Sequence, residues 1–207
     1  CLICLPKTAW PPTWAEGLKG GEAELVADSL VDADARSVYS HGIQRVKLYT
    51  KRIMSDCINR EGCPVIVVDR DATAVVDGDN AMGQTVGKFC MELAIQKARQ
   101  YGVSFVTARG SNHYGRCAYY TRMTLEYDMI GFSATIGGGN LMAPWGGTDS
   151  RVGNNPYSYA IPAFNHYPVV LDMAMSQYAY GKLGVYRLAG KQLPYPGGFD
   201  SQGNLTT

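Results

Sequence analysis

Short apolar segments alternate with helical segments in the middle of the chain, and this alternation restricts the fold more than any other feature. A strand-like run at Val103–Thr107 is followed by a polar loop, a helical stretch to about Tyr127 and a second strand-like run at Ile130–Thr135. Parallel strands need crossover connections of this kind, whereas antiparallel neighbours can be joined by short turns. The sequence therefore predicts an α/β fold with a mixed sheet that is at least partly parallel.

The N-terminal part of the chain is predicted to be helical. Glu22–Ala35 places apolar residues at helical spacing, with acidic residues on the remaining face. A second helix is predicted to begin at Ser40, because serine is a favoured N-cap and apolar residues recur after it at intervals of three and four. We expect a boundary near residue 64, between a helical part, 1–64, and a mixed α/β part, 65–207.

Further elements are indicated on both sides of the central alternation. Val65–Val68 and Thr73–Val76, joined by Asp-Arg-Asp, are typical of a hairpin, and strand-like runs recur at Tyr157–Ile161 and Val169–Leu171. A helix is predicted from about Thr85 to Gln100. Its expected apolar face consists of Val86, Phe89, Cys90, Leu93 and Ala94.

Charge and hydropathy argue against several classes of partner. Nineteen basic residues balance eighteen acidic ones, and no basic stripe with interleaved aromatic residues occurs, so nucleic acid and anionic membranes are not expected partners. No apolar run is long enough to span a bilayer, and the opening segment lacks the pattern of a secretory signal. We expect a cytoplasmic protein that acts on a small molecule.

Six cysteines are scattered along the chain, two of them in predicted helices. Reduced thiols are the interpretation we prefer, because a chain of this size does not need disulfides to be stable. The alternative is zinc held by Cys1, Cys4, Cys57 and Cys63, but the second spacing is too long and no histidine lies nearby in the sequence. We therefore expect no metal site.

His41 is the first candidate for chemistry, because it stands between Ser40 and a glycine with Arg45 four residues later. In the first turn of a helix capped by Ser40, the positive end of the helix dipole would disfavour a charged imidazole. Arg45 would lie one turn further on the same face, where its guanidinium can hold a carboxylate. This spacing suits a hydroxy acid or an oxo acid, and the alternative is a solvent-facing His and Arg on an ordinary helix.

Two segments that follow predicted strands are further candidates. Ser111–Gly115 contains His113 and stands where α/β sheets place their ligands, although a polar turn with a structural histidine is the other interpretation. Thr135–Asn140 contains three glycines that would let the backbone approach a phosphate closely. The chain has no G-x-G-x-x-G fingerprint.

Asp172 is a further candidate, because it ends an apolar strand where its carboxylate could be buried. A buried carboxylate needs a histidine or backbone donors as partners. The alternative is that Asp172 only caps a helix or turn after the strand.

Five short motifs occur together along the chain, and as a set they resemble one enzyme family. In order they are Ser40-His41-Gly42-x-x-Arg45, Ser111-Asn112-His113-x-Gly115, Ala143-Pro144-Trp145-Gly146-Gly147, Gly153-Asn154-Asn155-Pro156 and Leu171-Asp172-Met173-Ala174-Met175-Ser176. The set resembles the malate/L-lactate/ureidoglycolate dehydrogenase family of NAD(P)-dependent oxidoreductases. The C-terminal segment from Arg187 is most similar to the 2,3-diketo-L-gulonate reductase branch.

The resemblance implies a non-Rossmann nicotinamide-binding fold in residues 65–207 and a homodimer. It also implies interconversion of a 2-oxo acid, of the 2,3-diketogulonate, pyruvate or oxaloacetate type, with the 2-hydroxy acid. His41 would be the acid/base, Ser40 and Asp172 would orient it, and Arg45 would hold the substrate carboxylate. The alternative acid/base is His113, with Asn112 beside it on the substrate.

The resemblance implies NAD or NADP as the cofactor. The residues expected to contact it are Gly137, Gly138, Asn140, Asn155, Asp172, Met173, Ala174, Met175, Ser176, Gln177 and Tyr178. Ile136-Gly137 and Gly153-Asn154 depart from the residue pairs that family members often carry. The family also continues beyond the residues matched here, so the alternative function is a catalytically inactive, shortened member that serves only as a binding or association module.

Overall fold

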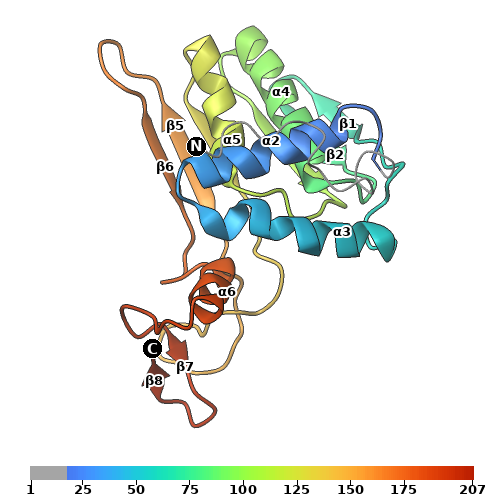
Figure 1. The fold of residues 1–207 in the computed structure, drawn as a ribbon. Helices are drawn as coiled ribbons and strands as arrows, with labels where there is room; N and C mark the ends of the chain where they lie inside the picture. The colour runs from blue at the N-terminus through green and yellow to red at the C-terminus, as the bar shows by residue number, and fades with distance from the viewer. Residues whose placement is uncertain (1–17) are drawn as a thin grey trace.

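The computed structural model describes residues 18–207. Its N-terminal part contains helix α2 (Glu22–Ala35), two short 3-10 turns at Tyr39–His41 and Ile43–Arg45, and helix α3 (Val46–Met54). In Figure 1 α2 lies across α4 (Gly83–Tyr101), the longest helix among the described residues, and α3 runs below α2. The helical character predicted for this part of the chain is therefore confirmed.

A three-stranded sheet carries the predicted mixed pairing. Its strands are β1 (Val65–Arg70), β2 (Thr73–Asp77) and β3 (Phe105–Arg109), in the order β1-β2-β3. The β1/β2 pair is an antiparallel hairpin, and β2 pairs with β3 in parallel across the α4 crossover. The predicted α/β fold with a partly parallel sheet is confirmed, and the loops after β2 and β3 leave the same edge of the sheet.

A second sheet contains only antiparallel strands. It consists of β4 (Gly131–Ala134), β5 (Tyr157–Ile161) and β6 (Val169–Met173), in that order. The short helix α5 (Cys117–Thr121) continues into a 3-10 segment, Arg122–Tyr127, and packs against β4 and β5. His166 lies in the connection between β5 and β6.

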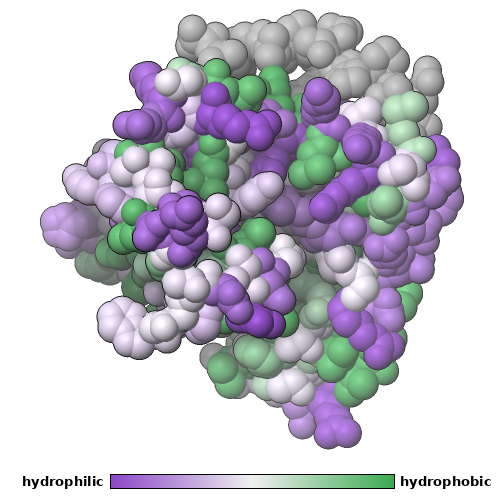
Figure 2. Space-filling view, turned by 90° about the horizontal axis from the view of Figure 1, so that it is seen from below, coloured by the Kyte–Doolittle hydropathy of each residue, from purple (hydrophilic) through white to green (hydrophobic). Residues whose placement is uncertain are grey.

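The C-terminal elements follow β6. Helix α6 (Tyr180–Leu188) packs against the 3-10 turn that contains His41, and β7 (Gly198–Phe199) pairs with β8 (Leu205–Thr206). In Figure 1 these elements lie at the opposite end of the molecule from α4. Figure 2 shows this end from below, with hydrophobic residues at the surface in several places. Ile136, Met175 and Leu188 are among the exposed apolar side chains.

The main apolar core joins the N-terminal helices to the start of α4. Burial of these side chains stabilises the fold by roughly 25 cal/mol for each Å² of apolar surface removed from water. The cluster consists of Leu18, Val26, Leu30, Tyr49, Ile53, Ile58 and Met82. Because Met82 belongs to the segment between β2 and α4, the residues on either side of position 64 share one core.

The structure corrects the predicted start of the second helix. The α-helix begins at Val46, and Ser40 lies in a 3-10 turn with no side-chain capping bond. Gly42 is extended, with φ −88° and ψ −150°, and the Asp34 carboxylate accepts a hydrogen bond from the Ile43 amide at 2.9 Å. A Cβ at residue 42 would lie 1.6 Å from Asp34 Oδ1, so this carboxylate fills the space beside the glycine.

Other element boundaries also differ from the prediction. β1 extends to Arg70, so only Asp71 and Ala72 connect the hairpin. β3 begins at Phe105 and not at Val103, because its partner β2 begins at Thr73, directly opposite Phe105. Strand ends are set here by the length of the pairing partner, which local sequence does not report.

The buried face of α4 was predicted only in part. Val86 is buried, but Phe89, Cys90, Leu93 and Ala94 are only partly covered. Met91 and Ile95 are buried instead, beside Tyr120 of α5. Lys97 is also buried, because it forms an ion pair with Asp69 of β1 and donates a hydrogen bond to the Asp71 carbonyl at 2.8 Å. Partners on another element therefore decide which face of α4 is covered.

Neither membrane spanning nor metal binding is indicated within residues 18–207. No helix there is both long and apolar enough to cross a bilayer. No group of three or more His, Cys, Asp or Glu side chains there could hold a metal ion. Cys57 and Cys63 are exposed free thiols, and Cys1 and Cys4 of the alternative zinc set lie outside the described residues.

We predict that Gly83→Ala lowers the free energy of unfolding by about 1–3 kcal/mol, the range found for overpacked sites. A Cβ at residue 83 would lie 2.3 Å from the Asn112 carbonyl oxygen and 2.5 Å from that of His113. Gly184→Ala in α6 is the matched control, because nothing lies within 4 Å of a Cβ there. Urea unfolding followed by circular dichroism measures both, and equal stability of the two variants would contradict the close approach.

Candidate active site

Two histidines from distant parts of the chain lie face to face. The rings of His41, in the 3-10 turn before α3, and His113, in the loop after β3, are stacked with centroids 5.5 Å apart and planes 17° from parallel. Both side chains are partly buried. The structure thus brings together the two motifs, Ser-His-Gly and Ser-Asn-His, that the sequence suggested as separate candidates.

Ser40 and Arg45 surround His41 on the N-terminal side. Ser40 Oγ lies 2.9 Å from His41 Nδ1, and Arg45 Nε donates a hydrogen bond to the Ser40 carbonyl at 2.7 Å. Helix α6 approaches closely here, since a Cβ at Gly181 would lie 2.0 Å from an Arg45 guanidinium nitrogen. Arg45 is therefore held beside His41 by its own backbone turn and by α6.

Tyr49 and Gln84 hold His113. The Tyr49 hydroxyl lies 2.6 Å from His113 Nδ1, and the Gly115 amide donates to the same nitrogen at 3.3 Å. Gln84 Nε2 donates to the Tyr49 hydroxyl at 3.2 Å. Tyr49 and Gln84 are both fully buried, and burial raises the pKa of Tyr49 to about 12. The tyrosine therefore keeps its proton at neutral pH.

Both histidines are neutral at physiological pH. Burial, followed by the charges of Arg45 and Arg116, lowers the pKa of His41 to about 4. Burial, followed by His41, Arg45 and Arg52, lowers the pKa of His113 to about 3. The neutral state predicted for His41 agrees with this lowered pKa, but the predicted cause was wrong. His41 is not in an α-helix, so the helix dipole is not the cause. Desolvation and the neighbouring guanidinium groups lower the pKa.

The surroundings of the two imidazoles are electropositive. Within residues 18–207 neither Arg45 nor Arg52 forms an ion pair with an acidic side chain, whereas the buried Arg116 is paired with Asp32 of α2. Burial lowers the pKa of Arg45, although a guanidinium keeps its proton in proteins. A partly buried cation without a carboxylate partner favours an anionic ligand.

The Asn112 side chain forms hydrogen bonds to the loop after β2. Its amide nitrogen donates to the carbonyl oxygens of Asn80 and Ala81, both at 2.9 Å, and to Asn80 Oδ1 at 3.0 Å. These bonds fasten the loop after β3 to the loop after β2, next to the start of α4. Asn112 thus sets the position of its neighbour His113.

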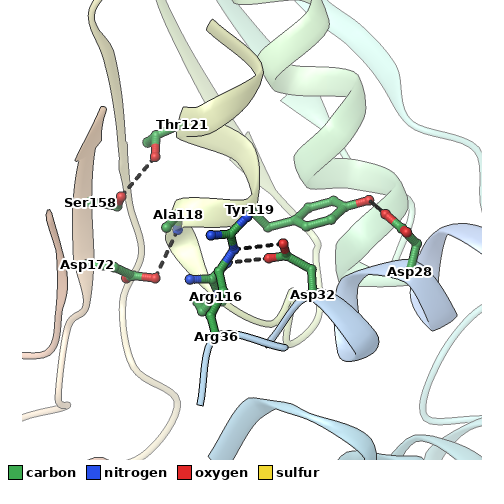
Figure 3. A network of polar contacts seen from close by, with 9 residues as sticks. All are labelled: Asp28, Asp32, Arg36, Arg116, Ala118, Tyr119, Thr121, Ser158 and Asp172. Carbon is green, nitrogen blue, oxygen red and sulfur yellow. Dashed lines mark hydrogen bonds and ion pairs between the residues drawn. The ribbon is translucent and has the colours of Figure 1, made fainter. Parts of the chain in front are cut away.

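Asp172 lies in β6 and binds backbone, not histidine. Its Oδ2 accepts a hydrogen bond from the Ala118 amide at 3.1 Å, in the first turn of α5. Burial raises its pKa, while this bond and the charge of Arg116 act in the opposite direction. Figure 3 shows Asp172 reaching from the strand to Ala118, with Arg116 and Asp32 on the other side of the α5 start. No described contact joins Asp172 to His41, so the backbone-donor alternative is the one observed.

Several of the residues expected at the cofactor meet beside β6. The Gly137 amide donates to Asn155 Oδ1 at 3.0 Å, and the Met175 amide donates to the Asn154 carbonyl at 2.9 Å. A Cβ at residue 137 would lie 2.0 Å from Asn154 Oδ1, so glycine is required for this approach. Asn155 has φ +32°, an uncommon conformation for a residue other than glycine.

The remaining expected cofactor residues divide into open and covered positions. Around Gly138 nothing lies within 4 Å of a Cβ, and Asn140 is exposed. Tyr178 is buried instead. Its hydroxyl donates a hydrogen bond to the Tyr195 carbonyl and accepts one from the Tyr195 amide, both at 3.0 Å. The segment between them contains exposed Met173, Met175 and Gln177 and partly covered Ala174 and Ser176.

Sequence reasoning missed Tyr49, Gln84 and Arg116. Tyr49 is one of the apolar residues that recur after Ser40 and was not considered as a site residue. It follows Arg45 by four residues and so shares its helical face. That spacing was the available signal. For Gln84 and Arg116 no local pattern indicates burial, because their partners Tyr49 and Asp32 are distant in the sequence.

The fold and the site define an α/β protein with a histidine-based, anion-favouring candidate site. The sequence profile of the malate/L-lactate dehydrogenase family matches residues 14–207. The chain belongs to this family, which confirms the resemblance seen in its motifs.

Individual relatives and solved structures support the same family assignment. The chain is 43% identical over 191 residues to a malate dehydrogenase of Pyrococcus horikoshii, a match that spans 92% of this chain and 52% of the relative. It is 36% identical over 194 residues to a 2,3-diketo-L-gulonate reductase of Klebsiella pneumoniae, spanning 91% and 57%. The structure of a putative malate/lactate dehydrogenase from E. coli superposes with a TM-score of 0.86 at 33% identity, covering 92% of this chain and 54% of that one. The chain spans about half the length of these relatives.

We predict that the two histidines make the protein less stable in acid. Because folding lowers both pKa values from about 6.5, the unfolded state binds more protons below that pH. Their contribution to stability is complete above pH 6.5 and is lost as the pH falls toward 4 and then 3. Urea midpoints at pH 7 and pH 4.5 should differ less in His41→Gln/His113→Gln than in the wild type. His166→Gln is the control, and an unchanged pH dependence in the double variant would contradict the prediction.

Proposed function

We propose that the protein interconverts a 2-oxo acid and the corresponding 2-hydroxy acid, with NAD(H) or NADP(H) as hydride carrier. The observation that supports this most directly is the pair of neutral, stacked imidazoles beside Arg45, a guanidinium without a carboxylate partner among the described residues. Acid/base chemistry next to a fixed cation suits a substrate whose reacting carbon carries a carboxylate. Membership of the malate/L-lactate dehydrogenase family supports the same reaction class.

In this proposal Arg45 binds the substrate carboxylate and His41 exchanges a proton with the substrate oxygen. During reduction the carbonyl carbon gains a hydride, the π electrons move to oxygen, and protonated His41 supplies the proton. A carboxylate on Arg45 offsets the guanidinium charge that helps to lower the pKa of His41. Substrate binding therefore favours uptake of the proton that reduction needs. Ser40 orients the imidazole through Nδ1.

The glycine turn and the segment after β6 fit a nicotinamide nucleotide. Gly138 has open space on its Cβ side, and Asn140 is exposed, so backbone amides can approach a phosphate or a ring. A bound nicotinamide would supply or accept the hydride. Asp172, which caps the start of α5 beside this segment, is assigned to the cofactor side of the site.

The substrates are proposed from the names of the relatives. Their names include a malate dehydrogenase and a 2,3-diketo-L-gulonate reductase, so oxaloacetate and 2,3-diketogulonate are the first substrates to test, followed by pyruvate. A cytoplasmic homodimer is the form proposed from the family resemblance, and sedimentation of the purified protein tests the dimer.

We predict that His41→Ala lowers kcat by at least about 100-fold, the scale of a lost general acid. Arg45→Ala should mainly raise KM for the acid, by roughly 10–100-fold, because a charge-assisted hydrogen bond contributes about 1.5–3 kcal/mol. NADH and NADPH oxidation at 340 nm with the panel of oxo acids measures both. His166→Ala, in the β5–β6 connection, is the matched histidine control.

Normal turnover in His41→Ala would contradict its role as the acid/base. Silence of the wild type across the panel would contradict the proposed activity of this chain and favour the binding-module alternative.

We predict that Gly138→Val weakens NADH binding at least about tenfold while stability is unchanged. A valine side chain has room in the protein itself, since nothing lies within 4 Å of a Cβ at this residue, but it would occupy the space proposed for the cofactor. Gly20→Val, another open glycine outside the site, is the control. Fluorescence titration with NADH measures the dissociation constants, and equal affinity of the two variants would remove the glycine turn from the cofactor site.

A further inference from the structure

Two hydrogen bonds meet at His113 Nδ1, a third supports one of them, and together they determine where the His113 proton lies. Tyr49 O–H and the Gly115 N–H both address Nδ1, at 2.6 and 3.3 Å, and Gln84 Nε2 lies 3.2 Å from the Tyr49 hydroxyl. A backbone N–H can only donate, so Nδ1 is the acceptor and carries no proton. Tyr49 then donates its single proton to Nδ1, and the Gln84 amide donates to the tyrosine oxygen.

The reverse arrangement is unfavourable. A proton on His113 Nδ1 would face the Gly115 N–H, and two donors would then point at each other. The neutral imidazole therefore carries its proton on Nε2. Tyr49 is fully buried, so water does not compete for this bond.

The two histidines differ in their ability to become charged. His113 would be protonated at Nδ1, where a proton removes the bond from the Gly115 N–H. It also forces the Tyr49 hydroxyl, which already accepts from Gln84, to turn its own proton away. His41 Nδ1 faces the Ser40 hydroxyl, which can either donate or accept. His41 can therefore gain a proton and keep its partner, whereas His113 loses the Gly115 bond and must reverse the Tyr49 bond. With ring centroids 5.5 Å apart, both rings cannot readily be cationic together.

We propose that Tyr49 is a positioning residue that holds His113 as the neutral Nε2–H tautomer, so that His113 polarises the substrate carbonyl and His41 alone exchanges the proton. The roles assigned to the histidines rest on the proposed oxidoreductase function, whereas the tautomer does not. A neutral imidazole is a poor acid but an effective hydrogen-bond donor to a carbonyl oxygen. This resolves which of the two histidines is the acid/base in favour of His41.

The tautomer can be read directly by long-range ¹H–¹⁵N NMR of the uniformly labelled protein at pH 7. The chain has only three histidines, and His41→Gln and His113→Gln assign the signals. We expect His113 Nδ1 to show the shift of an unprotonated nitrogen and Nε2 that of a protonated one. A protonated Nδ1 in the wild type would overturn the proposal, and this result needs neither turnover nor a variant of Tyr49.

Tyr49→Phe tests whether the Tyr49 hydroxyl is what holds His113 in this tautomer. Loss of the hydroxyl should shift the His113 nitrogens toward a mixture of tautomers and lower kcat by about 10–100-fold, with KM for the acid changed less than about twofold. Tyr119→Phe is the control, because it also removes one tyrosine hydroxyl bond, to Asp28 at 2.7 Å, outside the site. Unchanged His113 nitrogen shifts in Tyr49→Phe would overturn the role of Tyr49. Absence of NADH oxidation by the wild type would instead contradict the proposed function and leave the tautomer result standing.

Discussion

The hydrogen bond between Tyr49 and His113 is the contact on which the candidate site depends. It joins α3 to the loop after β3, and residues 64 positions apart are brought within 2.6 Å. The tyrosine ring belongs to the main apolar core, so the free energy of core burial also fixes the position of the hydroxyl. Since His41 stacks on His113, the same contact sets the spacing of the two imidazoles. Packing of the N-terminal helices is therefore part of the chemistry of the site.

Burial and excess positive charge act together on this pair. Desolvation lowers both histidine pKa values, and Arg45, Arg52 and Arg116 lower them further because no carboxylate contacts either ring among the described residues. Asp32 pairs with Arg116, and Asp172 is occupied by the Ala118 amide. Such a site stabilises an anionic ligand, and the ligand in turn stabilises the protonated form of His41. Binding and proton uptake are thus expected to be coupled.

Local patterns predicted those features of the fold that depend on neighbours in the chain. The alternation of strand-like and helical segments predicted a partly parallel sheet, and the parallel β2/β3 pair provides it. The two strands of the Val103–Thr135 alternation, β3 and β4, nevertheless lie in different sheets. The hairpin, α4 and β5 were found close to the predicted residues. The start of the second helix was predicted wrongly, because the Asp34 carboxylate, which occupies the space beside Gly42, is contributed by another helix. The neutral state of His41 was predicted for a wrong reason, since burial cannot be read from a helix start.

By itself the sequence determined the fold class, the family and the candidate site residues, because periodicity and motifs are formed by residues close together in the chain. Only the tertiary structure decided that His41 and His113 form one site, that Tyr49 and Gln84 hold it, and that Asp172 caps α5. These contacts join residues far apart in the sequence. They exist because burying apolar surface brings the elements together, and local propensity contains no information about which distant side chains then meet.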